Sequence, residues 1–357
     1  MTQDGFRQQP GFRPGAGQLP PRWGPPHPST RSTAPQQGPW AAPRQRRGRG
    51  PGPLLLLAVL VLVGLFVYST TLDEPATDTV RSGYENEDWA VPGTNDPVPD
   101  VPMPQYESDI AVWLQDNPLY RQQLPSPVRC DVAAIDNPGA MSDGALQTRM
   151  RGFVECLTRA WGPSLEAAGF QAYQPTLYVY PSGGEVSTSC GRQESFNAFY
   201  CGADQNLYLA ADVLRILPAR QAAARESYDL IIAHEYGHAM QGRSGLFAAF
   251  QYKIQAATSA SVAKQASRRA ELQADCFAGA AINSVADDMG WGSDAREAVA
   301  EISYEIGDDR LAQRFNQEVV EGDHGSAESR RAWAERGLSG AALSSCNTFV
   351  APASEVE

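Results

Sequence analysis

Two histidines and a glutamate stand at a spacing that can build a hydrolytic metal site. They form the run His234-Glu235-Tyr236-Gly237-His238. Residues four positions apart share one face of a helix, so both imidazoles can reach one metal ion at about 2 Å. Glu235 is turned by about 100° from His234, which suits it to take a proton from a water on the metal. The motif predicts a zinc hydrolase in which Glu235 is the general base.

A catalytic zinc site needs a third protein ligand and an open fourth position. Glu271 lies 33 residues after His238 on a second predicted helix, and Asp275 follows one turn later on the same face. We expect Glu271 to bind the metal and Asp275 to accept the free N–H of a ligating histidine. His324 is the alternative third ligand. With Glu271 on the metal, His324 is free to stabilise the oxyanion that develops during hydrolysis.

Two other functions are compatible with the motif. One is a zinc hydrolase that acts on a non-peptide amide, such as a cell-wall bond. The other is a non-catalytic binding domain with a structural metal or none. Glu235 argues against the binding domain, because a structural site has no use for a general base.

The first 72 residues divide into a polar tail and an apolar run. Residues 1–52 contain eleven prolines, eight arginines and one acidic residue, for a net charge of +7. This composition cannot bury enough apolar surface to fold, so we expect a disordered tail. Residues 54–72 carry no charge, and at about 1.5 Å each they span about 28 Å, close to the thickness of a bilayer core. We predict a transmembrane helix over residues 53–72.

The charges beside this run indicate its orientation. Four arginines precede it closely, and Asp73 and Glu74 follow it. Positive charge stays in the cytoplasm, so we predict a single-pass anchor in the cell membrane, with a cytoplasmic N-terminus and an extracytoplasmic catalytic domain. A cleaved signal peptide is the alternative, but the preceding tail is too long for one. The net charge is −12 overall and therefore −19 after residue 52, which does not favour nucleic acid as a partner.

Three regions are expected after the anchor. Residues 73–105 are rich in Pro, Asp, Glu and Thr, and they predict an extended spacer that holds the domain away from the membrane. Residues 106–350 have a globular composition and sufficient length for one sizeable core. Residues 351–357 are expected to form a C-terminal tail.

The globular region predicts many helices and few strands, which is the α+β class. The expected helices are Ser142–Trp161, Ser227–Gln241, Ser259–Asp288, Asp294–Asn316 and Ala327–Arg336, and the expected strands are Thr176–Tyr180 and Asn206–Leu209. The two motif histidines therefore lie on the second of these helices and Glu271 on the third.

The cysteines all lie beyond the apolar run. They are Cys130, Cys156, Cys190, Cys201, Cys276 and Cys346. An even number outside the cytoplasm indicates disulfides. Cys190 and Cys201 are the easiest local pair, since they close a short loop. The absence of Cys-x-x-Cys spacing argues against a cysteine zinc cluster.

Several runs in the globular region carry a family resemblance. They are HEYGHAMQ from His234, ELQADCFAG over Glu271–Gly279, HGSAESR over His324–Arg330, and the terminal Cys346-Asn347-Thr348-Phe349, together with Val154–Gly169 and Phe199–Leu209. In these runs the chain resembles the bacterial neutral zinc metallopeptidase family, over about residues 128–350. Within the wider zincins it resembles a gluzincin.

The resemblance implies a zincin-like fold with one zinc ion, which acts on a peptide or protein substrate. The implied zinc ligands are His234, His238 and Glu271. Glu235 is implied to be catalytic, and Asp275 to support a ligand from behind. The resemblance also implies the disulfides Cys190–Cys201 and Cys276–Cys346, which leaves Cys130 and Cys156 as the third pair. By analogy with other zincins, we expect the strand at 206–209 to bind an extended peptide by strand addition.

Overall fold

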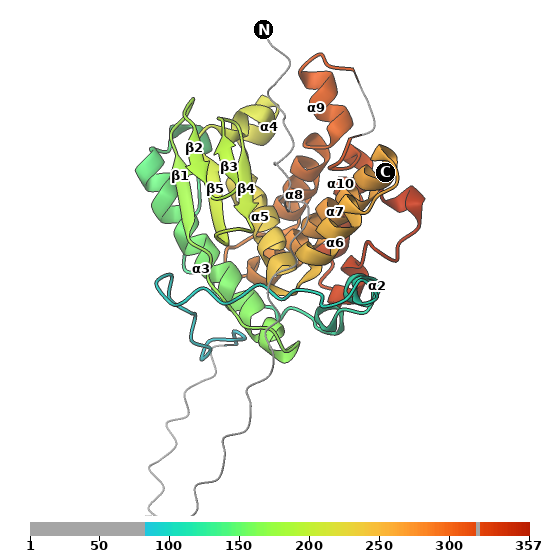
Figure 1. Cartoon of the computed structure of the whole chain (residues 1–357). Helices are drawn as coiled ribbons and strands as arrows, with labels where there is room; N and C mark the ends of the chain where they lie inside the picture. Colours follow the sequence, from blue (N-terminus) through green and yellow to red (C-terminus); the bar gives the residue numbers. More distant parts are fainter. Residues whose placement is uncertain (1–82, 319–321) are drawn as a thin grey trace, which may run out of the picture. The chain divides into compact units, whose positions relative to one another are not determined.

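A small mixed sheet packs against a larger group of helices in the computed structural model, which describes residues 83–318 and 322–357 (Figure 1). The strands are β1 (Leu177–Tyr180), β2 (Val186–Thr188), β3 (Gly191–Gln193), β4 (Ala198–Cys201) and β5 (Asn206–Ala210). The α-helices are α2 (Asp109–Gln115), α3 (Asp143–Ala167), α4 (Ala219–Ala222), α5 (Ser227–Arg243), α6 (Leu246–Gln255), α7 (Ala260–Val285), α8 (Ser293–Glu305), α9 (Asp308–Arg314) and α10 (Ala327–Leu338). The predicted α+β class is confirmed.

The main sheet has the order β1-β5-β4, with β1 parallel and β4 antiparallel to β5. Strand β5 is therefore central and has no free edge. The expectation that residues 206–209 bind a peptide by strand addition is wrong, because both sides of this strand are already paired. The free edge belongs to β4, which packs against α5. At the other edge, the Gln147 side chain bonds the N–H of Val179 at 2.8 Å and the carbonyl of Leu177 at 2.7 Å.

Helix α3 runs beyond the predicted end at Trp161 and continues through Pro163 to Ala167. Proline has no N–H, so the carbonyl four residues earlier, on Arg159, loses its helical partner. The side-chain amide of Asn86 donates to that carbonyl at 2.9 Å. A residue far away in the sequence thus restores the missing hydrogen bond, and the helix passes through its proline.

Residues 83–105 have neither helix nor strand, and they lie against the domain. Trp89 packs over Gly162 of α3, where an added Cβ would lie 2.1 Å from the indole ring. Further along, the buried Arg243 donates to the carbonyl of Pro99 at 2.9 Å. This part of the predicted spacer is therefore a surface segment fixed to the domain. The polar tail, the predicted transmembrane helix and residues 73–82 of the spacer lie outside the described residues.

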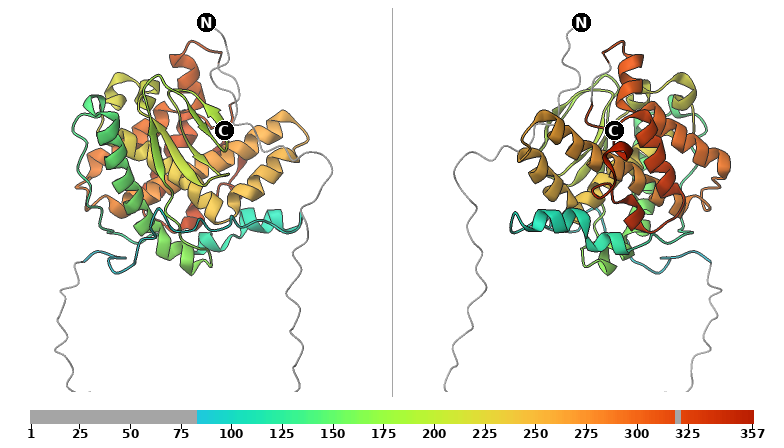
Figure 2. Two further views of the ribbon diagram at one scale, coloured as in Figure 1. Left: turned by 60° about the vertical axis from the view of Figure 1, so that its left-hand side comes forward. Right: turned by 90° about the vertical axis from the view of Figure 1, so that its right-hand side faces the viewer.

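Close helix packing brings α5, α7 and α10 together on one side of the sheet (Figures 1 and 2). A Cβ on Gly237 of α5 would lie 2.9 Å from the carbonyl oxygen of Ala274 on α7. Gly279 of α7 and Gly337 of α10 permit a similar approach between those two helices. Only glycine, which has no Cβ, allows two helix backbones to approach this closely. Every residue of α5 is buried.

The predicted helix over Asp294–Asn316 is instead two helices, α8 and α9, which is a further correction. The chain breaks at Ile306-Gly307. Gly307 lies so close to Ala327 that an added Cβ would sit 2.3 Å from its backbone nitrogen. Continuous helical periodicity in the sequence does not reveal this contact. Tertiary packing at Gly307 therefore ends the first helix earlier than predicted.

Three disulfides cross-link the described residues. They join Cys130 to Cys156, Cys190 to Cys201, and Cys276 to Cys346, as the family resemblance implies. Strands β2 and β3 form an antiparallel hairpin beside Cys190, and the sequence did not predict them.

The last residues, predicted as a tail, contact the domain. Val356 is fully buried, and its carbonyl accepts a hydrogen bond from Arg268 of α7 at 3.1 Å. Trp333 of α10 donates to the carbonyl of Glu355 at 2.7 Å. Among residues 83–318 and 322–357, no helix combines the length and apolar character that a membrane crossing requires.

Candidate metal centre

Helices α5 and α7 bring the predicted ligands together. His234 and His238 lie one turn apart on α5, and Glu271 faces them from α7. The close contact at Gly237 sets the separation of the two helices at this level. The three side chains are largely buried, and one nitrogen or oxygen of each lies within 4.8 Å of the others.

The distances within this group fit a tetrahedral zinc site. One oxygen of Glu271, Oε2, lies 3.3 Å from Nε2 of His234 and 3.4 Å from Nε2 of His238. Ligand atoms held at about 2.0–2.1 Å from a metal in a tetrahedron lie about 3.3–3.4 Å apart. The side chains are thus already spaced as zinc ligands, and two histidines with one glutamate are a common catalytic zinc set.

The other ring nitrogens support the same assignment. His234 Nδ1 lies 2.8 Å from Asp275 Oδ1, and His238 Nδ1 lies 2.8 Å from Gln241 Oε1. Both partners are acceptors, so each Nδ1 carries the proton and donates it. In the neutral imidazoles the Nε2 lone pairs then face the Glu271 carboxylate. Three electron-rich atoms at this distance repel one another unless a proton or a metal ion lies between them.

The electrostatics of the site also favour positive charge. Burial lowers the pKa of His234, but the carboxylates of Asp275 and Glu271 outweigh burial and raise it to about 9. Burial raises the pKa of Glu271, but the two histidines hold it well below its usual range. The site therefore stabilises an ionised Glu271 beside a positive charge. Either protons on the histidines or a divalent cation can supply that charge.

Glu235 lies between the ligand pair and the sheet. It is buried, and its Oε2 accepts a hydrogen bond from the backbone N–H of Tyr200 at 3.0 Å. Burial raises the pKa of Glu235. The neighbouring His234 and His238 lower it, but burial is the larger effect and the pKa lies above its ordinary value. Tyr200 is on the edge strand β4, so the carboxylate is fixed beside the free edge of the sheet.

Asp275 sits behind His234, as predicted from its place on α7, and has a second partner. Arg330 of α10 donates to its two carboxylate oxygens, from Nη2 at 2.8 Å and from Nε at 2.9 Å. The side chains of Asp275 and Arg330 are 1% and 5% exposed. Their pairing links α10 to the ligand His234.

His324 is apart from the ligand group. Its side chain is about half exposed (49%), and its Nδ1 lies 3.3 Å from Asp308 Oδ1 and 3.1 Å from Asp323 Oδ1. The buried part of the ring lowers its pKa, but these carboxylates outweigh that effect and raise the pKa well above the ordinary value. Glu271 also raises the pKa of His324. The structure thus places His324 within electrostatic range of Glu271, but as a member of another cluster.

Sequence reasoning missed three contributors to the site. Gln241 lies three residues after His238, and this helical spacing could have indicated it. It also donates from Nε2 to the carbonyl of Ala270 at 2.7 Å. Arg330 and the amide of Tyr200 come from other elements; both lie in runs that carry the family resemblance, but nothing in those runs indicates a contact with Asp275 or Glu235.

Comparison with known proteins identifies the family of the chain. The model of the family described as "Putative neutral zinc metallopeptidase" matches residues 132–349. The chain belongs to this family. The match includes the group formed by His234, His238 and Glu271, as well as Glu235 and Asp275.

Two uncharacterized bacterial proteins are similar to this chain over part of its length. The chain is 34% identical over 193 residues to the uncharacterized protein YpfJ of Escherichia coli strain K12, which covers 53% of this chain and 66% of the relative. It is 31% identical over 223 residues to the uncharacterized protein Rv2575 of Mycobacterium tuberculosis strain H37Rv, with coverage of 56% and 72%. The match thus spans just under two thirds of the length of the first relative. No solved structure shows a significant match.

Proposed function

We propose that the protein is a zinc-dependent endopeptidase, in which His234, His238 and Glu271 hold one zinc ion. The spacing of these three ligand atoms is the observation that carries the proposal. When bound, zinc polarises a water and the scissile carbonyl. Family membership supports a metallopeptidase reaction, and the substrate is a peptide or protein.

Glu235 is the general base and acid in this proposal. Its carboxylate is held beside the ligand pair by the amide of Tyr200. From this position it takes a proton from the attacking water and later delivers the proton to the leaving amine. The hydrogen bond to Tyr200 restricts the rotation of the carboxylate, so Glu235 is oriented before the substrate binds.

The edge strand β4 is the surface for an extended substrate. Asn197 accepts a hydrogen bond from Ala210 on β5 at 2.8 Å, and Ala198 pairs with Leu209 in register. Alternation along an antiparallel pair then turns the backbone groups of Ala198 and Tyr200 away from β5. The N–H of Tyr200 is taken by Glu235, so the backbone of Ala198 and the carbonyl of Tyr200 are the groups that can bond a peptide strand alongside Glu235. This geometry favours a peptide over a non-peptide amide.

His324 is proposed to stabilise the oxyanion. Asp308 and Asp323 hold its imidazole within electrostatic range of Glu271 and favour the protonated form. A positive donor near the metal suits the negative charge that develops on the carbonyl oxygen. Replacement of His324 by Asn should lower kcat by about 10²-fold or more and leave the zinc content unchanged.

Proteolysis and metal analysis test the enzymatic proposal. The full-length chain, purified in detergent, is compared with Glu235→Gln in casein and quenched-peptide cleavage. We expect kcat to fall by about 10²–10⁴-fold while bound zinc is retained. Glu328→Gln, the same chemical change at an exposed position of α10, is the control. Equal cleavage by wild type and Glu235→Gln would remove Glu235 from the mechanism, whereas bound zinc without cleavage of any amide would favour a binding domain.

We also propose that residues 53–72 anchor the protein in the cell membrane and that the catalytic domain is extracytoplasmic. The flanking charges support this orientation. The three disulfides support it as well, because such bonds persist in oxidising compartments. Membrane fractionation with alkaline extraction, followed by protease treatment of intact spheroplasts, tests both points. Protection of the domain from external protease would contradict the orientation.

A further inference from the structure

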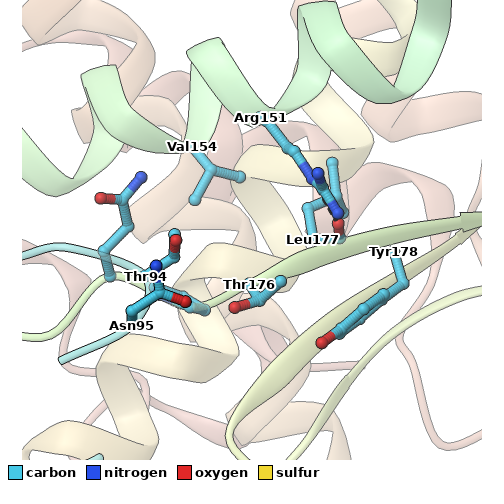
Figure 3. Close-up of a pocket in the computed structure, with 9 residues that line it drawn as sticks. Thr94, Asn95, Arg151, Val154, Thr176, Leu177 and Tyr178 are labelled. Carbon is cyan, nitrogen blue, oxygen red and sulfur yellow. Dashed lines mark hydrogen bonds between the residues drawn. The ribbon is translucent and has the colours of Figure 1, made fainter. Parts of the chain in front are cut away.

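A polar pocket lies at the β1 edge of the main sheet, whereas the metal centre lies near the β4 edge. It is formed by residues 94–95 of the surface segment, by α3 and by β1, and its volume is about 290 Å³. Strand β5 separates β1 from the edge strand β4. Figure 3 shows Arg151 and Val154 projecting from α3 towards β1, with Thr94 and Asn95 beside Thr176. No function described above uses these residues.

The charge of the pocket is positive. Its lining residues are Thr94, Asn95, Arg151, Val154, Gln174, Pro175, Thr176, Leu177 and Tyr178. None of them is acidic. Nε of Arg151 donates to the carbonyl of Leu177 at 3.1 Å, which fixes the guanidinium on the pocket wall. Within residues 83–318 and 322–357, the two terminal nitrogens of Arg151 have no hydrogen-bond or ion-pair partner. The two terminal nitrogens lie in one plane and are free to donate, so they can bind two oxygens of an anion.

The pocket also contains a largely buried glutamine. Gln174 is only 8% exposed, and across the described part of the chain its side-chain oxygen and nitrogen bond to no other group. These two atoms are not among the enclosed polar atoms that lack a partner in this part of the chain, so a molecule in the pocket can reach them. The second free group beside Arg151 can accept from, and donate to, a polar molecule in the pocket. Thr94, Asn95 and Thr176 add further short polar side chains.

We propose that this pocket binds a small polar ligand that carries an oxyanion, either a carboxylate or a phosphoryl group. The oxyanion pairs with the terminal nitrogens of Arg151, and the Gln174 amide bonds a neighbouring polar atom of the ligand. Such a ligand contacts three separate parts of the chain. It therefore ties the segment before α2 to α3 and to β1, at a distance from the metal centre.

Calorimetric titration of the zinc-loaded, full-length chain in detergent tests the proposal. The probes are sodium acetate for a carboxylate and inorganic phosphate for a phosphoryl group, with sodium chloride at matched ionic strength as the reference. We expect saturable binding of at least one probe in the millimolar range. Binding of acetate alone, or of phosphate alone, identifies the class of oxyanion. Binding of neither probe beyond the chloride reference would overturn the proposal.

Two variants locate the site. Arg151→Met should weaken binding by about tenfold or more, since a charge-assisted hydrogen bond is removed, while Arg151→Lys should keep part of the affinity. Gln174→Leu is the second test, because it keeps the volume and removes the amide. Arg220→Met, at an exposed arginine of α4, is the matched control. Unchanged affinity in both Arg151→Met and Gln174→Leu would place the anion elsewhere and overturn the proposal.

Hydrogen exchange gives an independent readout. The ligand should slow amide exchange in residues 93–96 of wild type, because it bridges this segment to α3 and β1. The peptidase activity of Arg151→Met should be unchanged. Failure of this site is thus distinguishable from failure of the proposed catalytic function.

Discussion

The buried pair of Asp275 and Arg330 is expected to contribute both to folding and to metal binding. Asp275→Asn keeps the shape of the side chain and an acceptor for His234, but it leaves the guanidinium of Arg330 buried without a counter-charge. Removal of one partner from a buried ion pair costs about 3–5 kcal/mol of unfolding free energy. Because asparagine retains one oxygen, we expect about 3 kcal/mol, the lower end of that range.

The corresponding shift in melting temperature follows from the size of the domain. A loss of 1 kcal/mol lowers the melting temperature by roughly 2–4 °C, so Asp275→Asn should lower it by about 6–12 °C. Arg330→Met should have a similar effect, since it leaves the Asp275 carboxylate with His234 alone. The double variant should be more stable than the sum of the two losses predicts, by about 2–3 kcal/mol.

Urea unfolding of the protein in EDTA, followed by circular dichroism, measures these losses. Arg331→Met is the control, because Arg331 is the next residue of α10 and pairs with three glutamates, but its side chain is 28% exposed. Surface ion pairs contribute only about 0–1 kcal/mol each. Zinc titration should show that Asp275→Asn binds the metal about 10–100-fold more weakly. Losses below about 1 kcal/mol for both single variants, or strict additivity in the double variant, would refute the reasoning.

Three further predictions concern the support of the site. Gly237→Ala introduces a Cβ 2.9 Å from the carbonyl of Ala274; it should cost about 1–3 kcal/mol and weaken zinc binding, as measured by calorimetry, because α5 and α7 must separate. Asn86→Ala leaves the carbonyl of Arg159 without its donor and should cost about 1–3 kcal/mol in thermal unfolding, whereas a loss within error would show that the segment does not support α3. Burial raises the pKa of Asp229 to about 6, so the folded state binds more protons than the unfolded state between about pH 4 and pH 6. The stability of wild type relative to Asp229→Asn should therefore be greatest at pH 4 and fall by about 2–3 kcal/mol towards pH 7 in urea titrations; no change with pH would contradict the shift.

The sequence could predict the ligand group because its information is local. The motif histidines are related by one helical turn, and Glu271 and Asp275 are related by another. Within each pair, the two residues share a face as soon as the segment is helical, so a helix prediction is sufficient to place them together. What brings the two helices into contact is the absence of a side chain at Gly237, and the structure identifies Ala274 as the residue it contacts.

Contributors that depend on tertiary contacts could not be predicted in the same way. Arg330 reaches Asp275 from a helix 55 residues later in the chain, and nothing in its neighbourhood marks it as buried. Strand β4 has four residues, and its place at the free edge depends on how β5 pairs. From the sequence we expected the strand at 206–209, which is β5, to bind the peptide. The strand with the free edge is β4.

Composition was also an incomplete guide to residues 83–105. Proline-rich, acidic sequence is typical of an extended spacer, and this segment does lack helix and strand. Proline also reduces the conformational entropy that is lost when a chain is fixed on a surface. A few anchors such as Trp89 and Asn86 are then sufficient to hold it. The prolines that suggest a spacer therefore also reduce the entropy lost when this segment is fixed on the domain.

We expect cysteine oxidation to support the proposed metal site through α7. Asp275 is followed directly by Cys276, whose disulfide with Cys346 joins α7 to the chain after α10. This bond restrains the end of α10 next to α7, and α10 carries Arg330, which holds Asp275 against His234. Reduction would increase the entropy of the unfolded chain and weaken that support. The metal centre is therefore best supported where disulfides persist, which favours the extracytoplasmic location proposed above.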